Sequence, residues 1–307
     1  MALHPHSEAL TIIGSSPTSR QLADLRRLSA FYGEVYGDTT SVPAVLRILG
    51  RSGRKSGSVK PADLYTRSLD CQNHGGYEML QRIAALAALY GELRDNMRVL
   101  DVGCGVGGPG RFLADRYGCR VIGIDVVPER VKRATALTKL TGLVRRVSHR
   151  QADATALAFA DAAFDQVWML DAGVHVRDKA ALFGQLARVL RPGGLLVLHD
   201  QFVLPSAMRP VRRRAPYFAP TLAQLLRHLE HAGFRLLAWQ DTTAQTLAYM
   251  QQRREDRLEQ ALQSATTTDP KRYRRALQLR DAYVEALSSQ GSRTGVLVGE
   301  RKRIVGS

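Results

Sequence analysis

Glycines recur at alternate positions in the segment VLDVGCGVGGPG, residues 99–110, where an apolar stretch gives way to a turn. Gly103, Gly105 and Gly107 lack a Cβ, so the backbone can turn tightly there and approach a ligand closely. With Cys104, which lies inside the turn, they form a candidate cofactor-binding loop. The glycines alone do not name the ligand, because the run that starts at Gly103 also fits the fingerprint of dinucleotide-binding dehydrogenases.

Three aspartates, each close to the end of a predicted strand, favour a different ligand. Asp101 lies two residues before the first glycine, where a carboxylate disfavours a nearby pyrophosphate and suits a cation or an amine. Asp125 ends the second strand, where an acid can accept hydrogen bonds from both ribose hydroxyls. Asp153 follows the third strand and suits an adenine amine. Each could instead cap a helix, but the three together indicate a nucleoside site that needs no phosphate.

The elements that must position these residues alternate between strand and helix from residue 98 onward. Apolar strand patterns are separated by helical patterns, with the strands at 98–103, 119–126, 147–153, 164–170 and 193–200. Parallel strands require helical crossovers, so this alternation predicts an α/β fold with a doubly wound, Rossmann-like sheet. Two more strand patterns, at 234–242 and 293–303, are separated by a long helical stretch.

We therefore expect a seven-stranded sheet with a helical N-terminal extension and a helical insert before the last strand. The predicted parts are a helical cap, a core, a helical insert or lid, and the last core strand with the C-terminus, at residues 1–77, 78–243, 244–290 and 291–307. The insert reads as two helices split at Asp269–Pro270, because proline disfavours helix in the residue before it. It is expected to cover the site or to form a homodimer surface.

The run DVGCGVGGPGR at residues 101–111 resembles the class I S-adenosylmethionine-dependent methyltransferases, and especially sterol C-methyltransferases and related small-molecule enzymes. The later LRPGGLLVLHD, residues 190–200, resembles the turn and fifth strand of the same superfamily. The last two strands fit its antiparallel terminal hairpin. The resemblance covers residues 78–241 and, more loosely, 293–303, and it implies S-adenosylmethionine as the cofactor.

By this resemblance, Asp101 lies near the methionine amino group of the cofactor and Asp125 binds the ribose, with Val126 beside it. Asp153 would lie by the adenine, and the backbone amide of Ala154 would point to the ring.

The resemblance also places Asp171 and His175, which follow the fourth strand, toward the methyl-transfer site. The usual pKa of histidine, about 6.5, suits His175 to act as a general base at neutral pH. His175 could instead pack beneath the following helix, and an N-methyltransferase does not always need a base.

The segment YTRSLDCQNHGGYEM, residues 65–79, resembles the approach to the core in glycine, sarcosine and dimethylglycine N-methyltransferase-like enzymes. It supplies two further catalytic candidates, Tyr65 and His74. By the same resemblance, Tyr65 and Arg82 contact the methionine end of the cofactor, where Arg82 would match a carboxylate. The alternative for Arg82 is an exposed helix position.

The chain has 307 residues and a net charge of +16, and 37 of its 44 basic residues are arginine. Arg209 and the run Arg212–Arg214 follow the fifth strand, where they would hold an anionic acceptor such as a diphosphate or carboxylate. A solvated basic loop is the alternative for this cluster, and a lineage bias toward arginine is the alternative for the charge.

The composition excludes collagen, disulfide-stapled and wholly disordered proteins. No apolar run approaches the roughly 20 residues of a membrane span, and the N-terminus lacks a signal-peptide pattern. Cys71, Cys104 and Cys119 match no metal or disulfide spacing, so no metal site is predicted and a cytoplasmic protein is expected.

The leading hypothesis is a small-molecule methyltransferase. The methylated atom is nitrogen, oxygen or carbon, and a nitrogen or carbon nucleophile is favoured. An RNA methyltransferase is an alternative suggested by the charge, although no RNA-binding module or basic stripe with interleaved aromatic residues is visible. A non-catalytic cofactor-binding partner subunit and a nicotinamide dehydrogenase are the remaining alternatives, and Asp101 disfavours the dehydrogenase.

Overall fold

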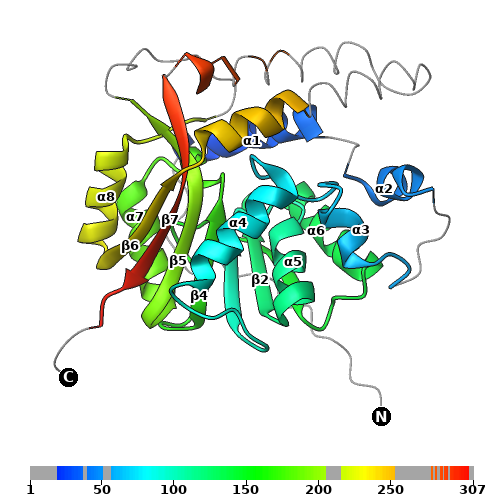
Figure 1. Ribbon diagram of the computed structural model, residues 1–307, viewed down its shortest axis with the longest axis horizontal. Helices are drawn as coiled ribbons and strands as arrows, with labels where there is room; N and C mark the ends of the chain where they lie inside the picture. The colour runs from blue at the N-terminus through cyan, green and yellow to red at the C-terminus, as the bar shows by residue number, and fades with distance from the viewer. Residues whose placement is uncertain are drawn as a thin grey trace.

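The computed structural model describes most of the chain as one sheet with helices on both faces (Figure 1). The described residues are 19–36, 40–50, 57–204, 216–252 and 291–303, with a few positions between 278 and 289. The strands are β1 Arg98–Val102, β2 Arg120–Asp125, β3 Val147–Gln151, β4 Phe164–Leu170, β5 Leu190–Val203, β6 Phe234–Asp241 and β7 Ser292–Arg301. The helices of the core are α4 Gly76–Ala88, α5 Gly108–Tyr117, α6 Pro128–Leu140, α7 Lys179–Val189 and α8 Leu222–His231, with a 3-10 turn, η1, at Gly173–His175.

The sheet has seven strands in the order β3-β2-β1-β4-β5-β7-β6. The first five strands in this order pair in parallel, whereas β7 runs antiparallel between β5 and β6. The prediction of a doubly wound sheet with an antiparallel last strand is therefore confirmed. The inserted antiparallel strand also departs from the wholly parallel order of dinucleotide-binding dehydrogenases, which makes that alternative less favourable.

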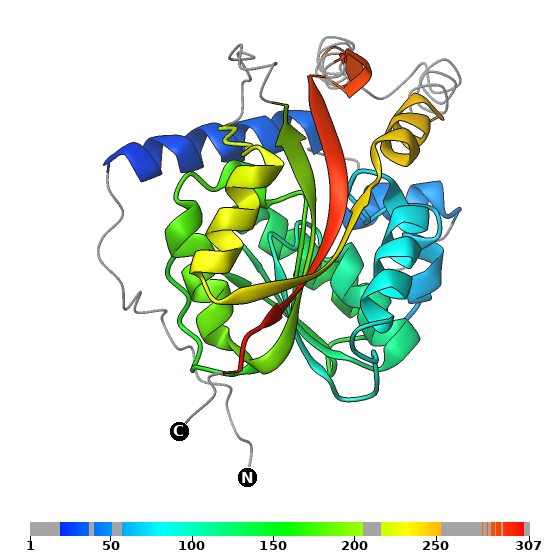
Figure 2. The ribbon, with the colours of Figure 1, turned by 60° about the vertical axis from the view of Figure 1, so that its left-hand side comes forward.

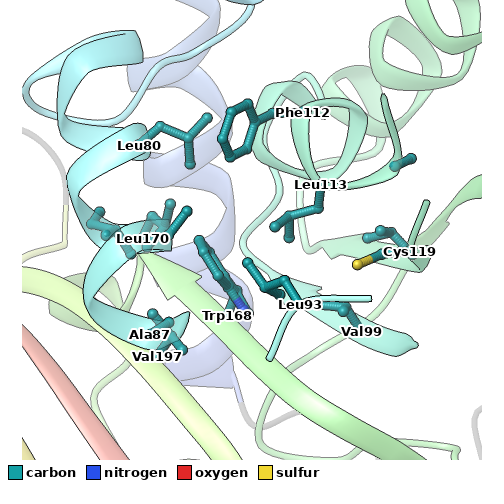
Figure 3. Packing of buried hydrophobic residues seen from close by; sticks show 14 of the residues in the cluster. Leu80, Ala87, Leu93, Val99, Phe112, Leu113, Cys119, Trp168, Leu170 and Val197 are labelled. Atoms are coloured by element: carbon teal, nitrogen blue, oxygen red, sulfur yellow. The ribbon is translucent and has the colours of Figure 1, made fainter. Parts of the chain in front are cut away.

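Two hydrophobic clusters pack against opposite faces of the sheet, because successive strand residues point to opposite sides. Val99 of β1 and Trp168 of β4 belong to the cluster beneath α4 and α5, where Figure 3 shows Trp168 among Leu80, Leu93 and Leu113. The neighbouring residues of the same strands, such as Leu100, belong to the cluster beneath α7 and α8. These layers fix the strands, so the carboxyl ends of the parallel strands meet at one edge of the sheet.

Some boundaries differ from the predicted ones. Apolar residues recur at helical spacing throughout residues 77–93, which predicts a helix over that range, but α4 ends at Ala88 and the chain turns before Gly91. Strand β5 begins at Leu190 and not at Gly193, because Leu190 already pairs with Phe164 of β4. Of the predicted insert, residues 244–252 are helical and 253–277 lie outside the described residues. None of the described helices is long and apolar enough to cross a membrane.

The N-terminal cap contributes three described helices, α1 Ser19–Tyr36, α2 Val42–Ile48 and α3 Pro61–Tyr65. Figure 2 shows α1, in blue, lying across the end of the sheet where the site residues gather. Leu28 and Tyr32 of α1 pack against Val126 and Val127, directly after β2. Near its other end, Asp24 pairs with Arg177, which precedes α7, at 2.8 Å. The cap therefore spans the edge from the β2 side to the β4 side.

A buried arginine joins the cap to the core. Arg111 of α5 and Asp70 of the cap have fully buried side chains that form an ion pair at 2.8 Å. The same guanidinium donates to the carbonyl oxygen of Val106 at 2.5 Å and to Thr138 Oγ1 at 3.0 Å. One charge thus holds together the cap, the glycine turn and α6.

Replacing Arg111 with methionine should destabilise the protein by about 3–5 kcal/mol, because Asp70 would remain buried without its counter-charge. The free energy of unfolding in urea measures this loss. Arg116→Met is the matched control, since Arg116 is exposed on the same helix. That substitution should change the free energy by no more than about 0.5 kcal/mol. Equal, small losses in both variants would contradict the role given to the buried pair.

Candidate functional site at the carboxyl edge of the sheet

The glycine turn after β1 takes the backbone conformation that only glycine adopts without strain. Gly103, Gly105 and Gly107 have φ values of +70°, +57° and +83°. Space is also restricted, because a Cβ on Gly103 would lie 2.3 Å from the Cβ of Ala172, which follows β4. The turn therefore packs directly against the end of the neighbouring strand, and a side chain at these positions would disrupt it.

Asp101 lies at the start of this turn with only 1% of its surface exposed. Burial raises the pKa of its carboxyl group to about 7, although a hydrogen bond from the backbone of Gly110 works against that shift. Its Oδ2 atom has no hydrogen-bond partner among the described residues. An orphaned oxygen in a buried carboxyl group is costly, so this position is suited to a ligand that donates an N–H group.

Asp125 at the end of β2 is held by the turn that it faces. Its Oδ2 accepts the backbone N–H of Gly105 at 3.0 Å, and its Oδ1 accepts that of Val127 at 2.9 Å. Arg130 of α6 pairs with the same Oδ2 at 3.2 Å. A Cβ on Gly105 would lie 2.3 Å from Nη2 of Arg130, so the guanidinium rests directly on the glycine turn. A ligand that binds Asp125 must therefore share this carboxylate with Arg130.

Arg130 also connects the turn to α1 and to His175. Its guanidinium lies 3.9 Å from the ring centroid of Tyr32, a cation–π geometry, and donates to Gln72 Oε1 at 2.8 Å. The hydroxyl oxygen of Tyr32 lies 3.0 Å from Nε2 of His175. Sequence reasoning missed Tyr32 and Arg130. A basic residue in the first turn after Asp125 was the only local signal for Arg130.

The ring of His175 is oriented by two hydrogen bonds. Its Nδ1 lies 2.7 Å from the carbonyl oxygen of Pro216, which can only accept, so Nδ1 carries the proton. In the neutral ring, Nε2 is then the acceptor and the Tyr32 hydroxyl donates to it. Burial lowers the pKa of His175 to about 4, against the hydrogen bond to Pro216. His175 is therefore neutral at pH 7, with Nε2 as its basic atom. A pKa of about 4 also makes it a weaker base than the ordinary histidine that the sequence analysis expected.

Asp171 at the end of β4 joins two histidines. Its Oδ2 accepts the backbone N–H of His74 at 2.7 Å, and its Oδ1 lies 2.9 Å from Nδ1 of the same histidine. His199 of β5, fully buried, lies 3.2 Å from Oδ1 through its own Nδ1. Asp171 also has a φ of +55°, which is strained for a residue other than glycine. Asp171 thus fixes the cap segment onto the sheet, and the sequence had not pointed to His199.

Burial alone would raise the pKa of Asp171, but His74 and His199 outweigh it, so the pKa falls below the usual range. Burial alone would lower the pKa of His199, but Asp171 outweighs it and the pKa is raised. Each group therefore keeps the other charged.

The remaining predicted cofactor residues lie around the β2 and β3 ends of the same edge. Asp153 is half-buried, and its Oδ1 accepts the backbone N–H of Thr155 at 2.8 Å in a local turn. Ala154 packs against the cluster beneath α7 and α8, and Val126 packs against α1. Cys104 is buried inside the glycine turn, and burial holds the pKa of its thiol well above the usual value.

Two predicted site residues are not brought to this edge. Tyr65 is buried in the hydrophobic cluster beneath α4 and α5, and its hydroxyl donates to Asp115 at 2.7 Å. Asp115 lies two turns along α5 from the glycine turn, about 10 Å away. Arg82 is exposed on α4, which matches the alternative given for it.

Arg209 and Arg212–Arg214 lie outside the described residues. The lid or homodimer surface expected of the insert stays a prediction.

Residues 99–194, which carry the glycine turn and the ends of β1 to β4, match the family model described as a methyltransferase domain. This part of the chain is therefore similar to methyltransferase domains. A 2-methyl-6-phytyl-1,4-hydroquinone methyltransferase of Synechocystis is 42% identical to it over 136 residues, covering 44% of this chain and 41% of that protein. The chain therefore spans less than half the length of this curated relative.

Two solved structures have the same fold. One, described as a sarcosine dimethylglycine methyltransferase from Galdieria sulphuraria, has a TM-score of 0.70 and 18% identity, covering 86% of this chain and 98% of that chain. The other is phosphoethanolamine N-methyltransferase 2 of Haemonchus contortus, in complex with phosphomonomethylethanolamine and S-adenosylhomocysteine. It has a TM-score of 0.70 and 18% identity, covering 90% of this chain and 60% of that chain.

The Asp171–His199 pair should give the protein a pH-dependent stability. A lowered carboxyl pKa stabilises the fold above the unfolded value near 4, and a raised histidine pKa stabilises it below the unfolded value near 6.5. Their joint contribution is thus greatest between about pH 4 and 6.5, and declines as pH rises through the folded pKa of His199. Asp171→Asn should consequently destabilise the protein more at pH 5.5 than at pH 9, by urea unfolding.

Asp161→Asn is the matched control, because exposed Asp161 pairs with Arg188, which stays charged throughout. Its effect should be the same at both pH values. An equally constant effect of Asp171→Asn would refute the charged pair.

Proposed function

We propose that this protein transfers a methyl group from S-adenosylmethionine to a small-molecule acceptor. The buried carboxyl group of Asp101 carries the proposal, because its Oδ2 has no partner among the described residues and lies beside the glycine turn. A cationic N–H donor such as the α-ammonium group of S-adenosylmethionine would satisfy that oxygen with a charge-assisted hydrogen bond.

The other residues of the edge fit the same cofactor. Asp125 offers its carboxylate to a ribose. The Oδ1 atom of Asp153 accepts both hydrogen bonds from Thr155, and its Oδ2 is the atom offered to an adenine amine. Gln72 lies close to the turn, since a Cβ on Gly105 would lie 3.1 Å from its Oε1. These groups need no phosphate partner, which favours a nucleoside with an amino-acid tail over a dinucleotide.

When bound, S-adenosylmethionine supplies a methyl group on a sulfonium centre, whose sulfur is a good leaving group. The protein's own task is to orient the acceptor and, where needed, to remove its proton. Neutral His175 is the group for that task, since its Nε2 accepts a proton and its Nδ1 is fixed by Pro216. Tyr32 donates to the same Nε2, so an acceptor proton reaches it through the Tyr32 hydroxyl or after this side chain turns away.

Asp171 and His74 serve this reaction as positioning residues. Both side chains are engaged with each other, and Asp171 is also engaged with His199. They hold the cap segment that carries Gln72 in place beside the glycine turn.

The acceptor is proposed to be an amine or carbon nucleophile that carries an anionic group. The Haemonchus contortus structure contains such a compound, phosphomonomethylethanolamine, and this chain has a net charge of +16. Neither it nor the other two similar proteins is described as acting on RNA. The oriented, neutral His175 favours catalysis over the role of a non-catalytic partner subunit.

Calorimetric titration of the full chain should show micromolar binding of S-adenosylmethionine and S-adenosylhomocysteine, with no binding of NAD. Asp125→Ala should weaken binding by roughly 1–3 kcal/mol, because charged hydrogen bonds to the ribose are lost. Glu129→Gln, an exposed carboxylate four residues further on, should leave the dissociation constant unchanged. Failure of both sulfur nucleosides to bind the wild-type protein would overturn the proposed function.

Methyl transfer from labelled S-adenosylmethionine to a panel of amines, phenols and prenyl diphosphates tests the catalytic step. With an acceptor that requires proton removal, His175→Ala should lower kcat by about 10²–10⁴-fold and leave the cofactor dissociation constant nearly unchanged. The control is His231→Ala, since His231 is exposed on the distant helix α8. Equal turnover in both variants would contradict a role for His175 as the base and leave it a packing residue.

A further inference from the structure

The 3-10 turn that carries His175 is held by two buried charged side chains from neighbouring elements. Lys179, the first residue of α7, donates through Nζ to the carbonyl oxygen of Gly173 at 2.9 Å and also to that of Val176. Asp200 of β5 accepts the backbone N–H of Val174 at 3.0 Å. The three bonds fix the backbone immediately before and after His175.

We propose that Lys179 and Asp200 are positioning residues that set the place and the environment of the His175 ring. This inference rests on the proposed function, in which His175 accepts the acceptor's proton. It adds two residues that neither the glycine turn nor the strand-end acids include.

The free-energy cost of burying Lys179 and Asp200 indicates that they do more than satisfy the backbone groups of the turn. Lys179 and Asp200 are only 7% and 5% exposed. Burial lowers the pKa of Lys179 to about 8 and raises the pKa of Asp200 to about 7, while each group's opposite charge works against the other's shift. Water would satisfy the same carbonyl and amide groups on a solvated turn without burying two charges.

Gly173 shows how closely the carboxylate is fitted to the turn. A Cβ at this position would lie 2.6 Å from Oδ2 of Asp200, so any larger residue would push the carboxylate away. The φ of Gly173 is not positive, so the requirement for glycine comes from this contact and not from the backbone conformation.

The charged groups around His175 act on its ring from several elements. Burial is the main reason that its pKa is low, and Arg130 of α6, His74 of the cap and Lys179 of α7 lower it further. Tyr32 of α1 faces Nε2 as a neutral donor, and Asp171 and Asp200 stand behind the turn on β4 and β5. Lys179 therefore both holds the turn and disfavours the imidazolium form.

An NMR titration of the histidine rings in the full chain tests the inference without an acceptor, with the His175 resonance assigned through His175→Gln. In Lys179→Met, the pKa of His175 should rise by roughly 1, because a neighbouring positive charge is lost and the turn admits water. Lys132→Met, an exposed lysine of α6, is the control and should leave the titration unchanged.

Gly173→Ala provides a second variant. It keeps both charged residues, and its added methyl group pushes the Asp200 carboxylate away from the turn. It should also raise the pKa of His175 toward that of a solvated ring. Gly184→Ala on α7 is its control, since no described atom lies within 4 Å of a Cβ there. If Lys179→Met does not fold, Gly173→Ala decides the question.

With an identified acceptor, both test variants should lose at least about tenfold in kcat, and cofactor affinity should stay within about twofold of wild type. Wild-type titration of His175 in the folded variants would overturn the inference. An error in the proposed function would be distinguished from this outcome, because the wild-type protein would then bind no S-adenosylmethionine.

Discussion

The positive charge of Arg111 must be balanced inside the protein, because its side chain has no contact with solvent. Asp70 provides the counter-charge, and carbonyl and hydroxyl oxygens from the glycine turn and α6 take the remaining N–H groups. A Cβ on Gly108 would lie 2.4 Å from the carbonyl oxygen of Asp70, so the cap chain rests directly on the start of α5. The glycine turn is thus closed from outside by a segment that precedes it in sequence.

From Asp70 the cap chain continues along the edge of the sheet past the ends of β2 and β4. Gln72 reaches Arg130 beside Asp125, and His74 reaches Asp171 at the end of β4. Arg130 then carries the connection to Tyr32 and His175. The surroundings of Asp125 and those of His175 are therefore joined through one guanidinium. In the proposed function, a ribose bound to Asp125 would share that carboxylate with Arg130 and so act on the group that stacks on Tyr32.

Sequence patterns predicted the parts of this arrangement that depend on local structure. Alternating strands and helices, the glycine turn and the acids at the strand ends are each visible within a few residues, since each follows from backbone periodicity or glycine geometry. The contacts of Tyr32 with His175 and of Lys179 with the turn join distant or differently folded segments, and no local pattern encodes them. The position of Tyr65 in the core could not be predicted for the same reason. Its type suggested chemistry, whereas its partner Asp115 lies on a helix 50 positions later.

His175 and His199 show why residue type could not assign roles at this edge. His175 is surrounded by Arg130, His74 and Lys179, so burial and positive charge both favour its neutral form. His199 is fully buried, but Asp171 lies 3.2 Å from its ring and stabilises the charged form. A proton acceptor must be neutral before the reaction, and an ion pair within the scaffold must be charged. Histidine meets both requirements because the nearby carboxylates bind differently. Asp171 faces the ring of His199, whereas Asp200 accepts the backbone N–H of Val174 in the turn of His175 and does not bind the His175 ring.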